Sequence, residues 1–207
     1  MITAPAAPKR ELPPKGNHVA RIYSIIHIGT ILSDFKNEDG SDKLVNTVSI
    51  GWELPNEKRT FNEEKGPQPM VISQDYTLSM NEKANMRKLV QGIIGTDLDE
   101  EEAGAFDVSK LMGMECMLQI NHKTSKKGSQ YAVVASGATI PKGMKVPKAI
   151  NEPRVLDYDN WNEELFQSLP DFMKDKISSS YQFRSKFNTK KDVKEVTEEV
   201  TTEDTPF

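Results

Sequence analysis

Alternating hydrophobic and polar positions predict three β-strands, β-branched and aromatic residues at 18–28 predict a fourth, and the return of a hairpin at 129–140 predicts a fifth. They cover residues 18–28, 44–54, 70–80, 114–123 and 129–140. In the second segment Ile50, Trp52 and Leu54 share one parity, and polar or small residues lie between them. A period of two with one apolar face is typical of a half-buried strand. The pattern therefore predicts a mainly β chain.

Between the third and fourth strands the hydrophobic period becomes helical. Residues 81–94 predict a helix that Asn81 caps and Gly95 stops, and a shorter acidic helix is predicted at 98–105. Three strands, a helix and a two-stranded hairpin follow the order of the OB-fold, a partly open five-stranded barrel. Another small barrel or a sandwich could share five strands, but a single helix between strands three and four favours the OB-fold.

The regions outside the predicted barrel differ from it in composition. Residues 1–15 contain four prolines and are expected to form a flexible N-terminal arm before a barrel domain at 16–150. Residues 151–187 predict a helical appendage, and 188–207 a disordered acidic tail. In the appendage Trp161, Phe166 and Leu169 lie on one helical stripe. Packing against the barrel or a sister subunit is favoured over a separate site.

Charge is divided unevenly along the chain. The net charge is −4, yet residues 195–207 hold five acidic residues and no Lys or Arg, so the remainder carries +1. Basic residues are frequent just before this end, over 174–194. A basic body with an acidic arm is typical of proteins that bind polyanions.

Composition also restricts the compartment. No apolar run approaches the roughly 18 residues that cross a bilayer, and the first residues lack the layout of a secretory signal. The lone Cys116 permits no internal disulfide and has the parity of a core residue. We therefore expect a cytoplasmic protein.

Motifs for catalysis or metal binding are not found. His18, His27 and His122 are far apart, and no zinc-ligand spacing or phosphate-binding glycine loop occurs. The expectation is a protein that is not an enzyme, with no cofactor and no metal.

Cations and aromatic residues instead predict contacts to single-stranded nucleic acid, where cations follow the phosphates and aromatic rings stack on bases. The candidates are Arg21, Tyr23, Lys36, Trp52, Lys58, Arg59, Phe61, Lys123, Lys126, Lys127 and Tyr131. Phe61 is the strongest aromatic candidate, because it lies in a polar loop between cations. Trp52 has the parity of Ile50 and Leu54, so burial competes with a binding role.

The C-terminal residues predict a second kind of interaction. Glu203, Asp204, Thr205, Pro206 and Phe207 combine acidic groups with one aromatic anchor. Such a peptide suits a basic, apolar pocket on another protein, although acidic tails are often only solvating.

These residues carry a resemblance to known families. The tail resembles the C-terminal peptide of bacterial single-stranded DNA-binding proteins, an acidic stretch followed by Pro-Phe. It departs from that form in having Thr205 before the proline and fewer consecutive acids. Residues 52–55, 107–113, 121–126 and 169–179 are similar to OB-type proteins of phage genomes. The chain thus resembles a phage-type single-stranded DNA-binding protein.

The resemblance implies a protein that coats single-stranded DNA during phage DNA replication, recombination and repair. It implies recruitment of polymerase, helicase–primase or recombinase through residues 203–207, in the host cytoplasm, with homo-oligomerisation left open. The alternative is a non-catalytic interaction module, such as a virion or anti-defence component, whose barrel binds protein.

Overall fold

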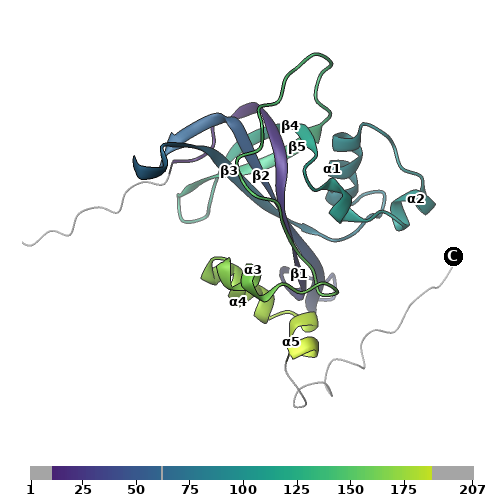
Figure 1. The fold of residues 1–207 in the computed structure, drawn as a ribbon. Helices are drawn as coiled ribbons and strands as arrows, with labels where there is room; N and C mark the ends of the chain where they lie inside the picture. The colour runs from purple at the N-terminus through teal and green to yellow at the C-terminus, as the bar shows by residue number, and fades with distance from the viewer. Residues whose placement is uncertain (1–10, 62, 188–207) are drawn as a thin grey trace, which may run out of the picture. The chain divides into compact units, whose positions relative to one another are not determined.

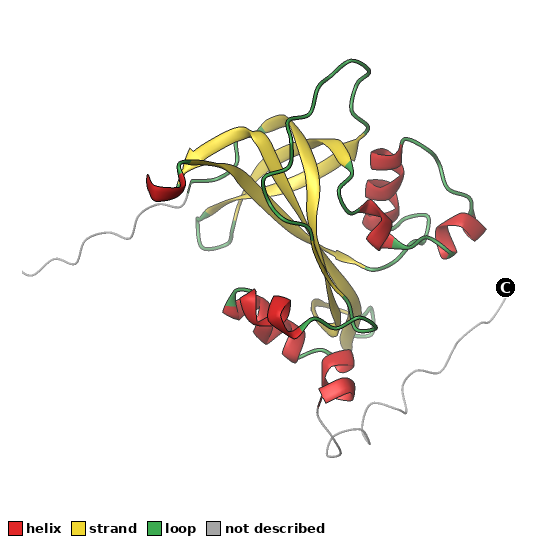
Figure 2. Ribbon diagram, in the orientation of Figure 1, coloured by secondary structure: helices red, strands yellow, loops and turns green. Residues whose placement is uncertain are grey.

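The computed structural model describes residues 11–61 and 63–187. It is mainly β, with a curled antiparallel sheet of five strands that forms a half-barrel and with a few helices (Figures 1 and 2). The sheet order is β3-β2-β1-β4-β5, and a short strand β6 pairs with β1. The strands are β1 (Gly16–Lys36), β2 (Asp42–Thr60), β3 (Pro67–Thr77), β4 (Glu115–Thr124), β5 (Gln130–Ala138) and β6 (Arg154–Leu156).

Helical segments separate and follow the strands. Those between β2 and β4 are η1 (Glu63–Lys65), α1 (Asn85–Ile94), α2 (Glu100–Gly104) and η2 (Val108–Leu111). Those after β6 are α3 (Glu163–Ser168), α4 (Asp171–Ser178) and α5 (Tyr181–Phe187).

The described chain divides into two compact units. The first comprises residues 11–26 and Val48–Val155, and the second comprises His27–Thr47 and residues 156–187. The predicted division placed residues 16–150 in one barrel domain and 151–187 in an appendage. The structure instead groups 27–47 with the helices that follow β6.

The core of the first unit follows the parity of β2. Ile50, Trp52 and Leu54 are completely buried, as a strand with one inward face requires. The Trp52 ring meets Tyr76 of β3 edge to face, with ring centroids 6.4 Å apart. The period-two prediction for this strand is confirmed.

A side chain links the two edge strands of the curled sheet. Gln74 of β3 accepts a hydrogen bond from the Val134 N–H at 2.8 Å and donates one to the Val134 carbonyl at 3.3 Å. One amide thus satisfies both backbone groups of a β5 residue, as a neighbouring strand would. The Gln74 amide also donates to the Tyr76 hydroxyl at 3.1 Å, which fixes its orientation.

Helix α1 packs against β5 through two glycines. A Cβ at Gly92 would run into the carbonyl oxygen of Gly137, and a Cβ at Gly137 would lie 2.9 Å from Ile93. The helix ends where predicted, at Gly95 with φ 71° in the left-handed region. Asn81 was predicted as its cap, which is wrong, because the N-cap residue is Ala84.

The second unit joins the β1–β2 turn region to three short helices. The Tyr158 hydroxyl donates to the Ile28 carbonyl at 2.8 Å and lies 2.7 Å from the Ser180 hydroxyl. Trp161 stacks on Tyr158 with centroids 5.6 Å apart and contacts the aromatic rings of α3 and α5. The predicted aromatic stripe therefore packs within this unit.

Two elements differ from the sequence prediction. The predicted strands 44–54 and 70–80 left residues 55–69 outside the sheet, but β2 continues to Thr60 and β3 begins at Pro67. Neighbouring β1 supports the polar end of β2, because the Glu57 carboxylate lies 3.0 Å from the ring Nδ1 of His18. Helix α5 was not foreseen as a separate element.

Candidate nucleic-acid interface

Two turns project from the same end of the sheet in the first unit. Strands β1 and β4 are antiparallel, with Gly16 opposite Ile120, so β4 ends where β1 begins. The His18–Glu57 contact places the end of β2 beside the beginning of β1 as well. The β2–β3 and β4–β5 turns therefore leave the sheet where β1 enters it. We call this place the entry end.

The β2–β3 side of the entry end carries an exposed ring beside cations. Phe61 is 65% exposed, although exposing a phenyl ring to water is unfavourable by comparison with burying it. Lys58 and Arg59, just before it, are exposed as well. Arg59 Nε lies 2.9 Å from a Glu11 carboxylate oxygen, but both side chains are more than half exposed. Such a surface pair is weak and can be exchanged for a phosphate.

The β4–β5 hairpin supplies a second ring. Tyr131 is 44% exposed and lies directly opposite Lys123 in the antiparallel register. Lys126 and Lys127 lie in the turn between β4 and β5 and are exposed. Gly128 has φ 82°, a left-handed conformation that glycine adopts without strain. The hairpin therefore carries three cations, Lys123 on β4 and two in the turn, together with the exposed Tyr131 ring on β5.

Together the two turns have the chemistry of a stacking platform. Phe61 and Tyr131 present faces that any unpaired base can cover, and the neighbouring lysines can pair with phosphates. Acidic residues lie nearby as well, at Glu63 and Glu64 of η1. The charge of this surface is therefore mixed, and its cations are concentrated on the β4–β5 hairpin.

Trp52 does not belong to this surface. It was a candidate for base stacking, but it is completely buried in the core of the first unit. Its indole Nε1 makes no conventional hydrogen bond, and the Cys116 thiol is its neighbour. Burial raises the pKa of Cys116 to about 12, and the Trp52 contact only partly opposes that rise. The inward-facing position of Trp52 on β2 decides that it is a core residue and not a base-stacking one.

Arg21 is also removed from the candidate contacts. Its side chain is only 11% exposed, and its guanidinium lies 3.1 Å from Glu53 and 2.6 Å from Glu115. It also donates to the Pro147 carbonyl at 2.8 Å. These partners occupy three of the five N–H donors of the guanidinium, and the low exposure restricts access of a phosphate to the others.

Tyr23 lies on the same outer face of β1 and is half-buried. Burial raises the pKa of its hydroxyl, Arg154 lowers it and Glu53 raises it further. A Cβ at Gly51 would lie 3.4 Å from the Tyr23 ring, so the ring lies against β2. Tyr23 therefore packs on the sheet.

Glu53 is a polar residue that the sequence reading missed. It is fully buried on the face of β2 opposite Trp52, where it receives hydrogen bonds from Arg21 and from Ile150 and Asn151. The available signal was a glutamate in the middle of an otherwise well-patterned strand. A buried carboxylate requires such partners.

Lys36 belongs to the second unit. It forms an exposed ion pair with Asp42 across the β1–β2 turn. Phe35 beside it is 77% exposed. This turn has an aromatic ring and a cation of its own, and we describe it separately from the entry end.

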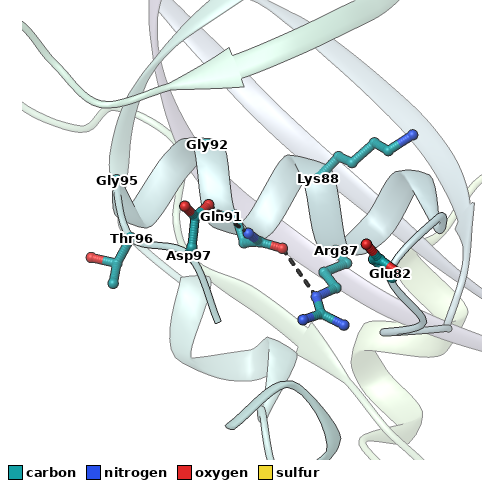
Figure 3. A pocket seen from close by; sticks show the side chains of 8 residues that line it. All are labelled: Glu82, Arg87, Lys88, Gln91, Gly92, Gly95, Thr96 and Asp97. Carbon is teal, nitrogen blue, oxygen red and sulfur yellow. Dashed lines mark hydrogen bonds between the residues drawn. The ribbon is translucent and has the colours of Figure 1, made fainter. Parts of the chain in front are cut away.

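A hollow of about 540 Å³ lies against α1 (Figure 3). Its lining includes Arg87, Gln91 and Asp97, which interact with one another or with the adjacent backbone. Arg87 also donates to Glu100 at 2.6 Å and to the Met80 and Leu98 carbonyls. Its guanidinium thus ties α1 to the segments around it and offers no free donor pair to a ligand.

Other predicted features fall elsewhere. Residues 203–207, the predicted partner-binding peptide, lie outside the described residues, as does most of the predicted N-terminal arm. Among the described residues no three His, Cys, Asp or Glu side chains gather in a way that could hold a metal ion. No helix in residues 11–61 or 63–187 has the length and apolar character needed to span a membrane.

Comparisons with protein-family models and with curated proteins give no match to this chain.

Proposed function

We propose that the protein binds single-stranded DNA without catalysing a reaction. The observation that carries this proposal is the pairing of exposed rings with cations at the entry end. Phe61 adjoins Lys58 and Arg59, and Tyr131 lies opposite Lys123. Stacking is sequence-tolerant and contributes about 1–3 kcal/mol per base, while the cations supply the salt-dependent part of the affinity.

The arrangement of strands supports an OB-type barrel for the first unit. The sheet order β3-β2-β1-β4-β5, with Gln74 bridging β3 to β5, brings together the edges that such a barrel closes. OB barrels bind oligonucleotides on the face of strands two and three and through the loops that join strands one to two and four to five. The hairpin that carries Lys126, Lys127 and Tyr131 joins strands four and five. This finer description of the fold is part of the proposal.

The biological role in the proposal follows from the resemblance of the sequence. The protein coats single-stranded DNA in phage replication, recombination and repair in the host cytoplasm. Residues 203–207 recruit replication or recombination proteins, because acidic groups followed by Pro-Phe fit a basic, apolar pocket. Deleting Pro206 and Phe207 should abolish that recruitment while leaving DNA affinity unchanged or higher.

Titration of the full chain with oligo-dT, oligo-U and duplex DNA tests the binding function. We expect clear preference for single strands and a fall in affinity with salt. Phe61→Ala or Tyr131→Ala should weaken oligo-dT binding about 5- to 150-fold, which corresponds to one lost stacking contact of about 1–3 kcal/mol. Phe172→Ala is the matched control, since Phe172 is 68% exposed but lies on α4 in the second unit. Equal affinity for duplex and oligo-dT, or equal losses in all three variants, would reject the proposal.

A further inference from the structure

A second cationic surface lies on the segment between β5 and β6. Residues 141–153, which we call the strap, contain no helix or strand and include Lys142, Lys145 and Lys148. Figure 1 shows this segment as a green trace that crosses the sheet. None of its lysines was among the contacts predicted from the sequence.

Hydrogen bonds involving Arg21 and the buried Glu53 carboxylate hold the strap on the outer face of β1 and β2 at Pro147, Ile150 and Asn151. The Glu53 carboxylate accepts from the Ile150 N–H at 3.2 Å, from the Asn151 N–H at 2.9 Å and from the Asn151 side-chain amide at 2.9 Å. Arg21 donates to the Pro147 carbonyl at 2.8 Å. Two strands of the sheet thus contribute one pinning side chain each.

Lifting the strap would be costly for a ligand. Glu53 would lose the three hydrogen bonds that it accepts from strap amides, and a hydrogen bond to a charged group contributes about 1.5–3 kcal/mol. The uncovered group would also be a carboxylate, which repels phosphate. A polyanion that reaches this face therefore passes over the strap and not beneath it.

The strap lysines are presented to solvent. Lys142, Lys145 and Lys148 are exposed, and none of them forms an ion pair within residues 11–61 and 63–187. Successive lysines are three residues apart, so an extended chain separates them by at most about 11 Å. This is close to the Debye length of about 10 Å at 0.1 M salt, so their potentials add. Glu152 is the one acidic residue of the strap.

We propose that the strap is a fixed phosphate-binding rail, in which the three lysines contact the sugar–phosphate backbone of a bound single strand. Its backbone is held at Pro147, Ile150 and Asn151 before the ligand arrives, so beside Lys148 binding has little backbone left to order. This inference rests on the proposed binding of single strands, and it adds contacts away from the entry end.

The test measures oligo-dT affinity of the full chain as a function of salt. The strap variant carries Lys142→Gln, Lys145→Gln and Lys148→Gln. Each phosphate contact contributes about 0.7 to the slope of log affinity against log salt for a single strand. The slope should therefore become shallower by about 2, and the affinity at 0.1 M salt should fall about 100-fold.

The matched control removes the same charge elsewhere. It carries Lys83→Gln, Lys88→Gln and Lys110→Gln, all exposed in the first unit and outside the strap. Its slope should change by much less than 1. An unchanged slope in the strap variant, or an equal change in both variants, overturns the strap proposal and leaves single-strand binding standing. If the unaltered protein does not bind oligo-dT, both proposals fail.

Discussion

Replacing Glu53 with alanine is expected to destabilise the first unit by about 3–5 kcal/mol, the usual cost of removing one partner from a buried charged pair. Glu53 is fully buried and accepts four hydrogen bonds, one from Arg21 and three from the strap. The substitution leaves the Ile150 and Asn151 N–H groups without their acceptor, at about 1–3 kcal/mol for each group that stays buried. Arg21 keeps Glu115 and the Pro147 carbonyl, which limits the loss.

Urea unfolding monitored by fluorescence measures this effect. The chain has two tryptophans, so a Trp161→Phe background leaves Trp52, in the core of the first unit, as the reporter. Glu115→Ala is the control. That carboxylate also contacts Arg21, but its side chain is 44% exposed, and such a pair is worth at most about 1 kcal/mol.

The same variant should release the strap. Trypsin cleaves after lysine, so Glu53→Ala should speed cleavage at Lys142, Lys145 and Lys148 relative to other sites. A free energy of unfolding within about 1 kcal/mol of the unaltered protein, together with unchanged cleavage of the strap, would refute the role given to Glu53.

Two further predictions concern the core of the first unit. Gly92→Ala should destabilise it by about 1–3 kcal/mol in the same urea assay, since the new methyl group meets the Gly137 carbonyl. The control Gly104→Ala, where a new Cβ meets nothing within 4 Å, should be neutral or stabilising. A larger loss of stability in Gly104→Ala than in Gly92→Ala would contradict the close packing of α1 on β5. Burial raises the pKa of the Cys116 thiol from 9.0 to about 12, so the unfolded chain loses this proton first. The stability that the buried Cys116 thiol contributes is therefore complete below about pH 9 and falls as the pH rises toward 12. Between about pH 8 and 10 the unaltered protein should lose stability relative to Cys116→Ala. A pH-independent difference would refute this burial.

Local signals predicted much of the fold. The period of two located β2, β3 and β4, while residue composition located β1 and the hairpin pattern located β5. Gly95 marked the end of α1 because a left-handed residue closes that helix end. The end of β2 was missed, because residues 55–60 are polar and become a strand only beside β1. Propensity does not contain the contribution of a partner strand.

The candidate site divides in the same way. The sequence singled out Phe61 and the hairpin lysines as an exposed ring and exposed cations, because polar neighbours surround them, and they are exposed in the structure. Trp52 is aromatic like Phe61, and Arg21 is a cation like the hairpin lysines. The structure nevertheless buries Trp52 in the core and pairs Arg21 with two carboxylates. Residue type alone does not separate these cases.

Alternation, turn residues and the separation of charge are properties of neighbouring positions, so the chain alone determines a mainly β protein with a basic hairpin and an acidic end. The pinning of the strap depends on Glu53 and Asn151, which lie 98 positions apart and meet through hydrogen bonds of 2.9 Å. The Gln74–Val134 bridge likewise spans 60 positions. Such contacts exist only after the sheet has curled, because folding brings together residues that are distant in sequence. The local sequence around one partner does not indicate which residue the other will be.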